Sequence, residues 1–313
     1  MGRSLLDKKT LVVLTGATGG IGREIAVQLS KRLAAGSKLF ILGRREKLLE
    51  EVATGIREKQ PEILVDARPW DLAKFPEYQA DFAQFMQENK TGYESYMLIH
   101  NAATIGDLRK YTWDWDKAED IVDYFNINLV SMILLNGLWY KAIKEAANVD
   151  KLVVNLTSIL AVQPMASVSL YCTGKSAREG WMRVLAAEAP ELRILNYAPG
   201  LVDTPMLDTL RYDSAHQPIR HWFKAADHPV ISTEASVERL LGELEANEFL
   251  NAQHLDVHDV GDAAPEVEYG GFAERLLGVL EANEFLNVQH LDVHDVGDAA
   301  PEVEYGGFAG AGH

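Results

Sequence analysis

Short apolar runs alternate along the chain with longer segments in which apolar residues recur every three or four positions. The short runs are rich in branched side chains and predict buried strands, while the longer segments predict helices packed by one face. The predicted strands are residues 11–14, 38–42, 63–65, 95–100, 152–156 and 192–197. This alternation predicts the α/β class, with a Rossmann-like, doubly wound parallel sheet and helices on both faces.

Two longer stretches stand out from this pattern. Residues 117–146 predict one long helix, which carries Asn126 and Asn128. Residues 201–230 are rich in Pro, Asp and His and only weakly periodic, so they predict a mobile substrate loop. In a sheet of this kind ligands bind at the carboxyl ends of the strands, and the candidate residues below follow those ends.

A glycine-rich turn joins the first predicted strand to a helix. Gly16, Gly20 and Gly22 lie in this turn. Glycines let the backbone approach a pyrophosphate, and the free N–H groups at a helix N-terminus attract its charge. The turn therefore predicts a dinucleotide cradle, with an ordinary glycine turn as the alternative.

The end of the second predicted strand bears on the choice of dinucleotide. Folds that bind NAD usually place a carboxylate there, whereas this chain has Arg44. A guanidinium suits a 2′-phosphate, so NADPH is predicted, with a solvated arginine pair as the alternative. Asp71 follows the third strand, where an acid can reach the adenine amino group. The small residues of Asn101-Ala102-Ala103 follow the fourth strand and leave room for ribose and nicotinamide.

The stretch 152–175 holds three further candidates. Its strand delivers Ser158 to the carboxyl end, and Tyr171 and Lys175 follow in a predicted helix. Their i, i+4 spacing puts the phenol and the ammonium on one helical face, about one turn apart. A nearby cation lowers the pKa of a phenol, and a serine hydroxyl can hold a carbonyl oxygen while the tyrosine gives it a proton. A Tyr-x3-Lys pair alone occurs often by chance. Here it accompanies Ser158 and an upstream dinucleotide cradle, so we expect the three side chains to protonate a carbonyl.

Composition limits the class of protein. The chain has 313 residues, 47% hydrophobic and 24% charged, as in a globular protein of one or two domains. No apolar run approaches the roughly 18 residues of a membrane span, and the N-terminal apolar run is too short for a signal peptide. The single cysteine, Cys172, fits a reducing compartment, so we expect a cytoplasmic protein.

Most of the negative charge lies in a duplication. Residues 238–273 and 274–309 are near copies that differ only at Glu243/Val279 and Ala252/Val288. The copies together contribute −15 of the net charge of −16, so the rest of the chain is close to neutral. The sequence thus offers no basic patch for nucleic acid and no basic amphipathic helix for a membrane.

Several of these motifs together resemble the short-chain dehydrogenase/reductase family. They are Thr15-Gly16-x3-Gly20-x-Gly22, Asn101-Ala102-Ala103, Asn128, Ser158, Tyr171-x3-Lys175 and Pro199-Gly200. Longer segments at 100–107, 128–132, 163–164, 171–178, 196–204, 247–249 and 253–256 extend the likeness to the pterin-reducing members, over about residues 9–260. Two positions depart from the pattern. Ala103 replaces a glycine, which is tolerated if its backbone is not left-handed, and Gly19 stands where many NADPH-using relatives carry a basic residue.

The resemblance implies NADPH-dependent reduction of the side-chain carbonyl of a pterin, in steps that yield tetrahydrobiopterin. Tyr171 would be the general acid, Lys175 would lower its pKa and bind the nicotinamide ribose, Ser158 would orient the ketone, and Asn128 would hold a water between Lys175 and solvent. The implied cofactor-binding residues are Gly16, Thr18, Gly20, Ile21, Gly22, Arg44, Asp71, Leu72, Asn101, Ala102, Tyr171, Lys175, Pro199, Gly200 and Thr204. The implied substrate-binding residues are Ser158, Tyr171, Gly200, Met206 and Asp256.

By the same resemblance Asp256 matches the acid that anchors the amino-pyrimidine edge of the pterin, a donor pair suited to a carboxylate. Without the family, Asp256 is a solvated acid at a strand end, and Asp292 is its counterpart in the second copy. His254, Asp256 and His258 alternate onto one strand face, but nothing supplies the remaining ligands of a metal site, so we expect no metal.

The expected organisation is a reductase domain over residues 1–260 and an acidic extension over 261–313 that holds most of the second copy. The resemblance implies a homodimer through the helices around 117–146 and 172–189. Two other functions remain open: a reductase of other small carbonyl and dicarbonyl compounds, and a non-catalytic, NADP-sensing interaction protein with the acidic tail as its docking element.

Overall fold

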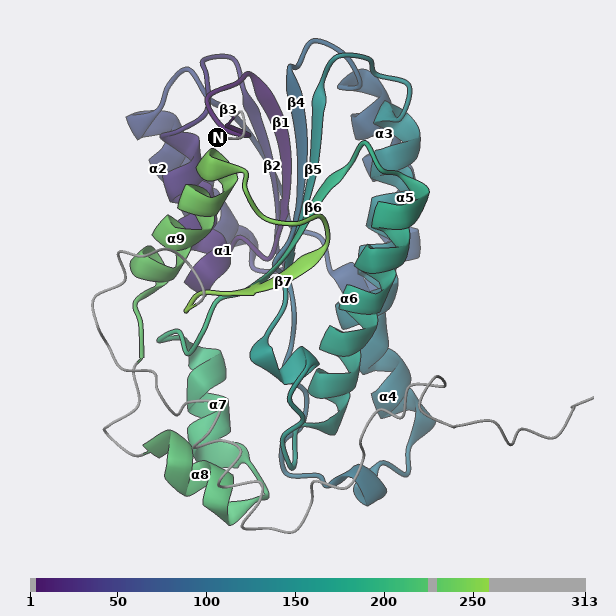
Figure 1. Ribbon diagram of the computed structural model, residues 1–313, viewed down its shortest axis with the longest axis vertical. Helices are drawn as coiled ribbons and strands as arrows, with labels where there is room; N and C mark the ends of the chain where they lie inside the picture. The colour runs from purple at the N-terminus through teal and green to yellow at the C-terminus, as the bar shows by residue number, and fades with distance from the viewer. Residues whose placement is uncertain (1–3, 225–229, 259–313) are drawn as a thin grey trace, which may run out of the picture. The chain divides into compact units, whose positions relative to one another are not determined.

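The computed structural model describes residues 4–224 and 230–258, which hold a single parallel sheet between two layers of helices (Figure 1). The strand order is β3-β2-β1-β4-β5-β6-β7. The strands are β1 (Thr10–Thr15), β2 (Lys38–Leu42), β3 (Leu64–Arg68), β4 (Ser95–His100), β5 (Asp150–Leu156), β6 (Arg193–Ala198) and β7 (Gln253–Asp256). The α-helices are α1 (Gly20–Ser30), α2 (Glu46–Lys59), α3 (Phe75–Glu88), α4 (Ala118–Phe125), α5 (Ser131–Ile143), α6 (Ser169–Glu188), α7 (Pro205–Asp213), α8 (Gln217–Lys224) and α9 (Thr233–Ala246). The doubly wound α/β prediction is confirmed.

The strand order reverses between β1 and β4, which pair in parallel from Thr10 opposite Ser95 to Leu14 opposite Ile99. From β1 the chain runs outward through β2 to β3, and from β4 it runs the other way through β5 and β6 to β7. At such a switch point the loops leave the strand ends in opposite directions and open a crevice. Many of the candidate residues lie on the loops that follow these strand ends.

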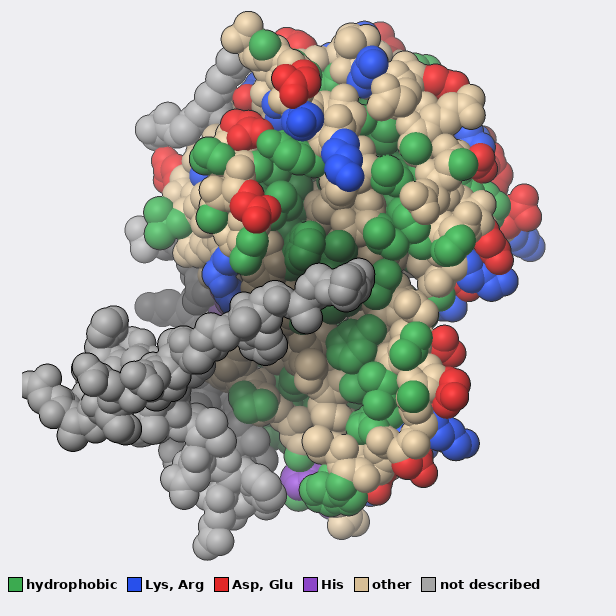
Figure 2. Space-filling view, turned by 90° about the vertical axis from the view of Figure 1, so that its right-hand side faces the viewer, with side chains coloured by type: hydrophobic (Ala, Val, Ile, Leu, Met, Phe, Trp, Pro, Cys, Tyr) green, Lys and Arg blue, Asp and Glu red, His purple; other side chains and the backbone are tan. Residues whose placement is uncertain are grey.

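Helix α4 continues into α5 through a π-helical stretch, η3 (Asn126–Val130), so the predicted long helix forms. Within the described residues this helix, Ala118–Ile143, is long and apolar enough to cross a membrane by length and composition. Asn126, Asn128 and Asn136 interrupt its apolar residues, so the sequence has no continuous apolar run of that length there. Its inner side packs against the sheet through Leu135 and Trp139, both 0% exposed, as a core helix does. Figure 2 faces the side that carries α3, α5 and α6 and shows hydrophobic side chains among charged ones.

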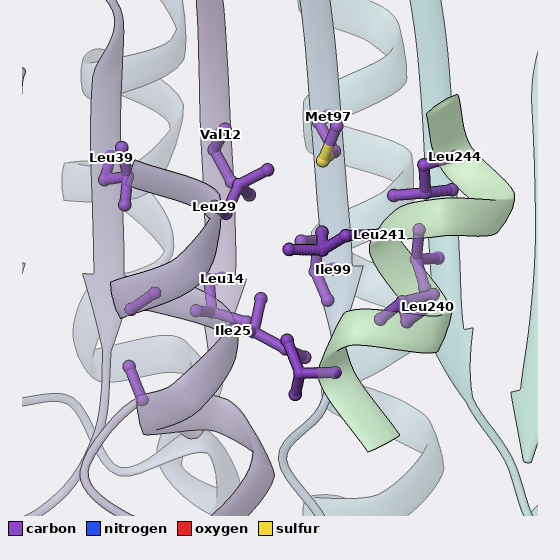
Figure 3. Close-up of a cluster of buried hydrophobic side chains, with 14 of the residues drawn as sticks. Val12, Leu14, Ile25, Leu29, Leu39, Met97, Ile99, Leu240, Leu241 and Leu244 are labelled. Atoms are coloured by element: carbon purple, nitrogen blue, oxygen red, sulfur yellow. The ribbon is translucent and has the colours of Figure 1, made fainter. Parts of the chain in front are cut away.

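Two hydrophobic clusters cover the two faces of the sheet. Alternate residues of each strand point to opposite faces, so Val12 and Leu14 join one cluster and Leu11 and Val13 the other. In Figure 3 helices α1 and α9 lie over the first face, where Ile25 packs with other aliphatic side chains of both helices and the strands. The second face carries α3, α5 and α6. The central strands are therefore buried on both sides, as their continuous apolar runs require.

The expected loop over 201–230 is wrong in its secondary structure, because two helices form within it. Helix α7 starts with Pro205 in its first turn, and α8 follows after a short turn. Leu207 and Leu210 of α7 are buried, as are Ile219 and Phe223 of α8. Each helix is too short to show more than one turn of apolar spacing, so the periodicity over the whole segment was weak.

The first copy of the duplicated segment completes the sheet. It supplies most of α9 and all of β7, which pairs in parallel with β6 from Gln253 opposite Leu195 to Asp256 opposite Ala198. The side chains of Leu240, Leu241 and Leu244 are 0% exposed, and the Leu5 N–H donates to the Leu244 carbonyl at 3.1 Å. The second copy, Asp292 and the expected extension over 261–313 lie outside the described residues.

These contacts predict that the two copies differ in their effect on stability. Leu241→Ala should lower the free energy of unfolding by about 2–5 kcal/mol, because it opens a cavity under α9. The same substitution at Leu277, its counterpart in the second copy, should leave that free energy nearly unchanged. Urea unfolding followed by circular dichroism measures both. Equal losses from the two substitutions would contradict the assignment of the first copy to the sheet.

Candidate active site

The cradle between β1 and α1 has no room for side chains. Gly16 has φ +74°, and a Cβ on Gly22 would lie 2.2 Å from the Gly16 carbonyl oxygen. Gly20 also has positive φ, and no side chain caps the N-terminus of α1 beside Thr18 and Ile21. The first N–H groups of that helix are thus open to an anion. The cradle fits the pyrophosphate of a dinucleotide.

Asn101 braces this cradle from the end of β4. Its side-chain amide donates to the carbonyls of Thr15 and Gly16, both at 3.1 Å. In return the Thr15 hydroxyl accepts the N–H groups of Asn101 and Ala102, at 3.1 and 3.0 Å. Asn101 therefore supports cofactor binding indirectly, by holding the shape of the glycine turn, while Ala102 lines that turn. Ala103 does not have a positive φ, so its replacement of glycine needs no strained backbone.

Two arginines follow β2, and their places differ. Arg44, the predicted partner of a 2′-phosphate, is exposed beside the cradle. Arg45 also reaches the cradle, since its guanidinium donates to the Thr18 hydroxyl at 3.2 Å. The same guanidinium lies 3.2 Å from where a Cβ would stand if Gly19 had one. The sequence interpretation missed Arg45, although the adjacent arginines were visible in it. Both cations are placed to meet a phosphate beside Thr18.

The predicted adenine end lies after β3. The Asp71 carboxylate accepts the Ala73 N–H at 3.2 Å and so caps the short helix η1 (Leu72–Lys74). Leu72 is buried in the core below that turn. Asp71 keeps its second carboxylate oxygen for another donor.

Tyr171 and Lys175 lie one turn apart on the inner face of α6, as predicted. The Lys175 Nζ lies 5.4 Å from the Tyr171 ring centroid and donates to the Leu156 carbonyl, the last residue of β5, at 2.5 Å. Ser158 caps η4 (Ile159–Ala161) by accepting the Leu160 N–H at 3.2 Å, and its side chain is hydrogen-bonded to Tyr171. The structure thus brings the three predicted catalytic side chains together at the end of β5.

The pKa of Tyr171 differs from the expectation. Burial raises it to about 12, although the Ser158 hydrogen bond and the charge of Arg178 act to lower it. Burial also lowers the pKa of Lys175 well below its ordinary value, and the neighbouring charge of Arg178 adds to this. Desolvation outweighs the lowering expected from Lys175, so the tyrosine is a protonated phenol at neutral pH, which is the state a proton donor needs.

Asn128 lies in the π-helical stretch between α4 and α5. Its side-chain amide donates to the Tyr124 carbonyl at 2.9 Å, and its amide oxygen accepts the Thr104 N–H at 2.9 Å. The π-helical turn changes the backbone pairing there, and the buried asparagine supplies a partner to the Tyr124 carbonyl. Asn128 therefore ties this helix to the loop after β4.

The loop after β6 lies on the opposite side of the site. Gly200 has φ +78°, and a Cβ there would lie 2.7 Å from Val257 Cγ1. The Pro199 carbonyl accepts the Ser236 hydroxyl at 2.9 Å, which fixes the turn. Thr204 precedes α7 without a capping hydrogen bond from its side chain, and its methyl group lies near Gly20. Met206 lies half-buried in the first turn of α7. This loop thus meets the cradle directly.

Asp256 ends β7 beside this loop. Its side chain is 14% exposed, and its Oδ1 accepts the His258 N–H at 3.1 Å and lies 3.9 Å from His258 Nε2. His254 points instead to α6, where its Nδ1 lies 2.8 Å from Glu179 Oε1. The described residues contain no group of three side chains that could hold a metal ion.

Glu179 links three elements, and the sequence interpretation gave it no role. Its Oε1 also accepts the Thr157 hydroxyl at 2.5 Å. Burial acts to raise its pKa, but the hydrogen bonds from His254 and Thr157 leave that pKa below its ordinary value. The signal was the i+8 spacing from Tyr171, which places Glu179 on the same helical face.

The chain matches known proteins over most of its length. A family model described as short chain dehydrogenase matches residues 10–215. Sepiapterin reductase from Mus musculus is 33% identical over 79% of this chain and 96% of its own length. Benzil reductase ((S)-benzoin forming) from Bacillus cereus is 27% identical over 64% of this chain and 78% of its own. A short chain dehydrogenase from Escherichia coli CFT073, solved in complex with NADPH, matches with a TM-score of 0.62 and 23% identity over 82% of this chain and 99% of its own.

The cradle makes Gly22 the most sensitive position for cofactor binding. Gly22→Ala should weaken NADPH binding at least about tenfold, because the new methyl group forces the turn away from the strand. Gly55→Ala in α2 is the matched control, since a Cβ there meets nothing within 4 Å and should leave binding unchanged. Quenching of protein fluorescence on NADPH titration measures both. Equal affinity in the two variants would refute the cradle.

Proposed function

Because this chain belongs to the short-chain dehydrogenase family and is an NADP-dependent oxidoreductase, we propose that it reduces the side-chain carbonyl of a pterin such as sepiapterin. Three arguments support the proposal: the cradle, the buried Tyr171 beside Ser158, and the carboxylate of Asp256 across the site. The likeness to sepiapterin reductase over most of both chains supports the pterin in particular.

NADPH is the proposed cofactor, and the residues at the strand ends fit it. Gly16, Gly20 and Gly22 leave space for the pyrophosphate, and Arg44 and Arg45 bring positive charge to the 2′-phosphate. Ala102 and the turn at Pro199 and Gly200 would border the nicotinamide. When bound, NADPH supplies the hydride that the carbonyl carbon accepts.

Tyr171 supplies the proton for this reduction. Burial keeps the phenol protonated at neutral pH, and Ser158 lies within hydrogen-bonding reach of it. The serine hydroxyl can hold the substrate carbonyl oxygen while Tyr171 Oη donates its proton to the same oxygen. The phenolate left behind is protonated again from solvent, which restores the acid.

Lys175 and Asn128 lie behind the tyrosine. Lys175 is fixed by the Leu156 carbonyl and is placed to bind the nicotinamide ribose. Asn128 holds the backbone of the helix beside it through Tyr124 and the loop through Thr104. We assign to Asn128 the support of the proton path from solvent to Lys175.

The observation that carries the choice of a pterin is the position of Asp256. Strand β7 pairs with β6 so that Asp256 lies opposite Ala198, next to the turn at Pro199 and Gly200. The carboxylate is thus held beside the proposed nicotinamide wall and is 14% exposed. The amino-pyrimidine edge of a pterin offers two parallel N–H donors, which a carboxylate accepts well. A simple carbonyl compound has no such donors.

A reductase of aromatic diketones is the second candidate, and the likeness to benzil reductase favours it. Such a substrate would use Ser158, Tyr171 and Lys175 in the same way but would not need Asp256. The third hypothesis, a non-catalytic sensor of NADP, has no use for the close arrangement of these three side chains, so the geometry disfavours it.

We also propose a homodimer through α4, α5 and α6. The outer side of these helices exposes apolar side chains that a monomer would leave in water: Val122, Val130, Leu134, Trp181 and Val184. The largest of them, Trp181, is 40% exposed on α6, the helix that carries Tyr171. Exposed apolar side chains on these neighbouring helices favour an interface there.

The pterin assignment predicts a selective effect at Asp256. Asp256→Asn should raise the KM for sepiapterin at least about tenfold, because it removes a charge-assisted pair, while turnover of benzil stays close to that of the unaltered protein. Asp292→Asn, at the counterpart in the second copy, is the matched control and should change neither. NADPH consumption measures all three. Unchanged sepiapterin kinetics in Asp256→Asn would refute the pterin anchor.

The dimer proposal predicts that a charge at Trp181 separates the subunits. Trp181→Glu should shift the sedimentation coefficient from that of a dimer to that of a monomer, because burying a carboxylate in an apolar interface is costly. Arg183→Glu introduces a carboxylate two residues further along α6, on a different side of the helix, and serves as a control for added negative charge. A monomeric unaltered protein would contradict the proposal.

A further inference from the structure

Arg178 is a buried arginine beneath the candidate active site. It lies on α6 one turn beyond Lys175 and is 1% exposed. Its Nη2 donates to the His100 carbonyl at 2.7 Å and its Nη1 to the Ala102 carbonyl at 3.3 Å. Its Nε donates to Asn155 Oδ1 at 2.8 Å. The guanidinium thus ties α6 to the ends of β4 and β5.

All three partners of this guanidinium are neutral. Among the described residues no ion pair includes Arg178, and the nearest carboxylate along the helix, Glu179, is bound to Thr157 and His254. A buried charge without an opposite charge is costly, so its burial calls for an explanation. Two backbone carbonyls and an amide could be satisfied by a neutral donor. The positive charge itself therefore needs a counterpart that is not a fixed carboxylate.

The groups facing Arg178 come from several elements. Tyr171 and Lys175 lie on its own helix, Tyr124 faces it from α4 and His100 from the end of β4. Burial, with the charge of Arg178, lowers the pKa of His100 to about 3 and lowers that of Lys175, while burial raises that of Tyr124.

Arg178 itself keeps its proton at neutral pH. Burial lowers its pKa only to about 10, because the nearby tyrosines act to raise it. The phenol of Tyr124 contacts the backbone of Gly174, where a Cβ would lie 3.1 Å from its Oη, and stays neutral. Arg178 therefore brings a positive charge close to Tyr171 at neutral pH.

We propose that Arg178 is a positioning residue for the reduction, whose buried charge offsets the negative charge that forms on Tyr171 Oη as its proton leaves. It also holds the Ala102 backbone, next to the nicotinamide, against α6. In this step the proton passes from Tyr171 Oη to the carbonyl oxygen of the substrate, the phenolate remains, and a proton from water later restores the phenol. The inference rests on the proposed role of Tyr171 but not on the pterin.

Loss of the charge has a defined sign. A positive charge favours the phenolate and lowers the pKa of Tyr171, so a neutral side chain at 178 raises that pKa and weakens the proton donor. Lys175 opposes this in part, because it holds its own proton more readily once Arg178 is gone. We expect a net rise of about one pKa unit, which corresponds to about a tenfold loss of kcat.

The test compares two variants. Arg178→Gln keeps a hydrogen-bond donor but removes the charge, whereas Arg178→Lys keeps the charge but removes the planar set of guanidinium donors. Steady-state kinetics at pH 7, where Arg178 is charged, give kcat and KM with whichever of sepiapterin and benzil the unaltered protein reduces, and fluorescence quenching gives the NADPH affinity. Arg178→Gln should lower kcat about tenfold with little change in KM or NADPH affinity. Arg178→Lys should keep kcat near that of the unaltered protein, as should Arg183→Gln, the exposed control on the same helix.

Two results would overturn the proposal. One is an unchanged kcat in a folded Arg178→Gln. The other is an equal loss of kcat in Arg178→Lys and Arg178→Gln, which would make the hydrogen bonds of the guanidinium, and not its charge, the important feature. If Arg178→Gln does not fold, Arg178→Lys alone decides, because only the charge role predicts a normal kcat. The kcat can be measured on benzil as well as on a pterin, so failure of the pterin assignment gives a different result from failure of this one.

Discussion

The inner face of α6 is the constraint on which the site depends. Lys175, Arg178 and Glu179 are all buried there, and each needs hydrogen-bond partners that only strand ends and nearby loops supply. Lys175 donates to the Leu156 carbonyl, and Arg178 donates to groups at the ends of β4 and β5. Glu179 is hydrogen-bonded to Thr157 and His254. All of these hydrogen bonds form together only when α6 has one rotation about its axis and one position along it. That position fixes Tyr171 beside Ser158.

The same polar contacts continue across the sheet to the proposed substrate anchor. Asn155 accepts from Arg178 and donates to Asn196 Oδ1 on β6 at 2.8 Å, and Asn196 donates to the Ala252 carbonyl just before β7 at 2.9 Å. Glu179 reaches β7 by a second route through His254. The proton donor and Asp256 are therefore held by one buried network, although they lie far apart in the sequence. Rigid support of this kind is what orientation in catalysis requires.

Much of this could be predicted from local patterns. The buried strands, the glycine cradle and the Tyr171–Lys175 spacing depend on residues close together in the chain, and the structure has them where the sequence placed them. Helices α7 and α8 were missed because each is short and buries only a few apolar residues. The hydrogen bond of Arg45 to Thr18, the partners of Glu179 and the three partners of Arg178 depend on residues far apart in the chain. The i+8 spacing from Tyr171 places Glu179 on the right helical face but does not reveal those partners. The raised pKa of Tyr171 was missed for the same reason, since burial is a property of the packed site.

The most direct test of the central claim is a single-turnover measurement of NADPH oxidation with sepiapterin, comparing the unaltered protein with Tyr171→Phe at saturating NADPH. Phenylalanine keeps the buried ring but removes the proton donor. The account predicts unchanged NADPH affinity and a loss in the rate of carbonyl reduction of about 10²–10⁴-fold. Reduction by Tyr171→Phe at the rate of the unaltered protein would contradict it, because the proton would then come from another group.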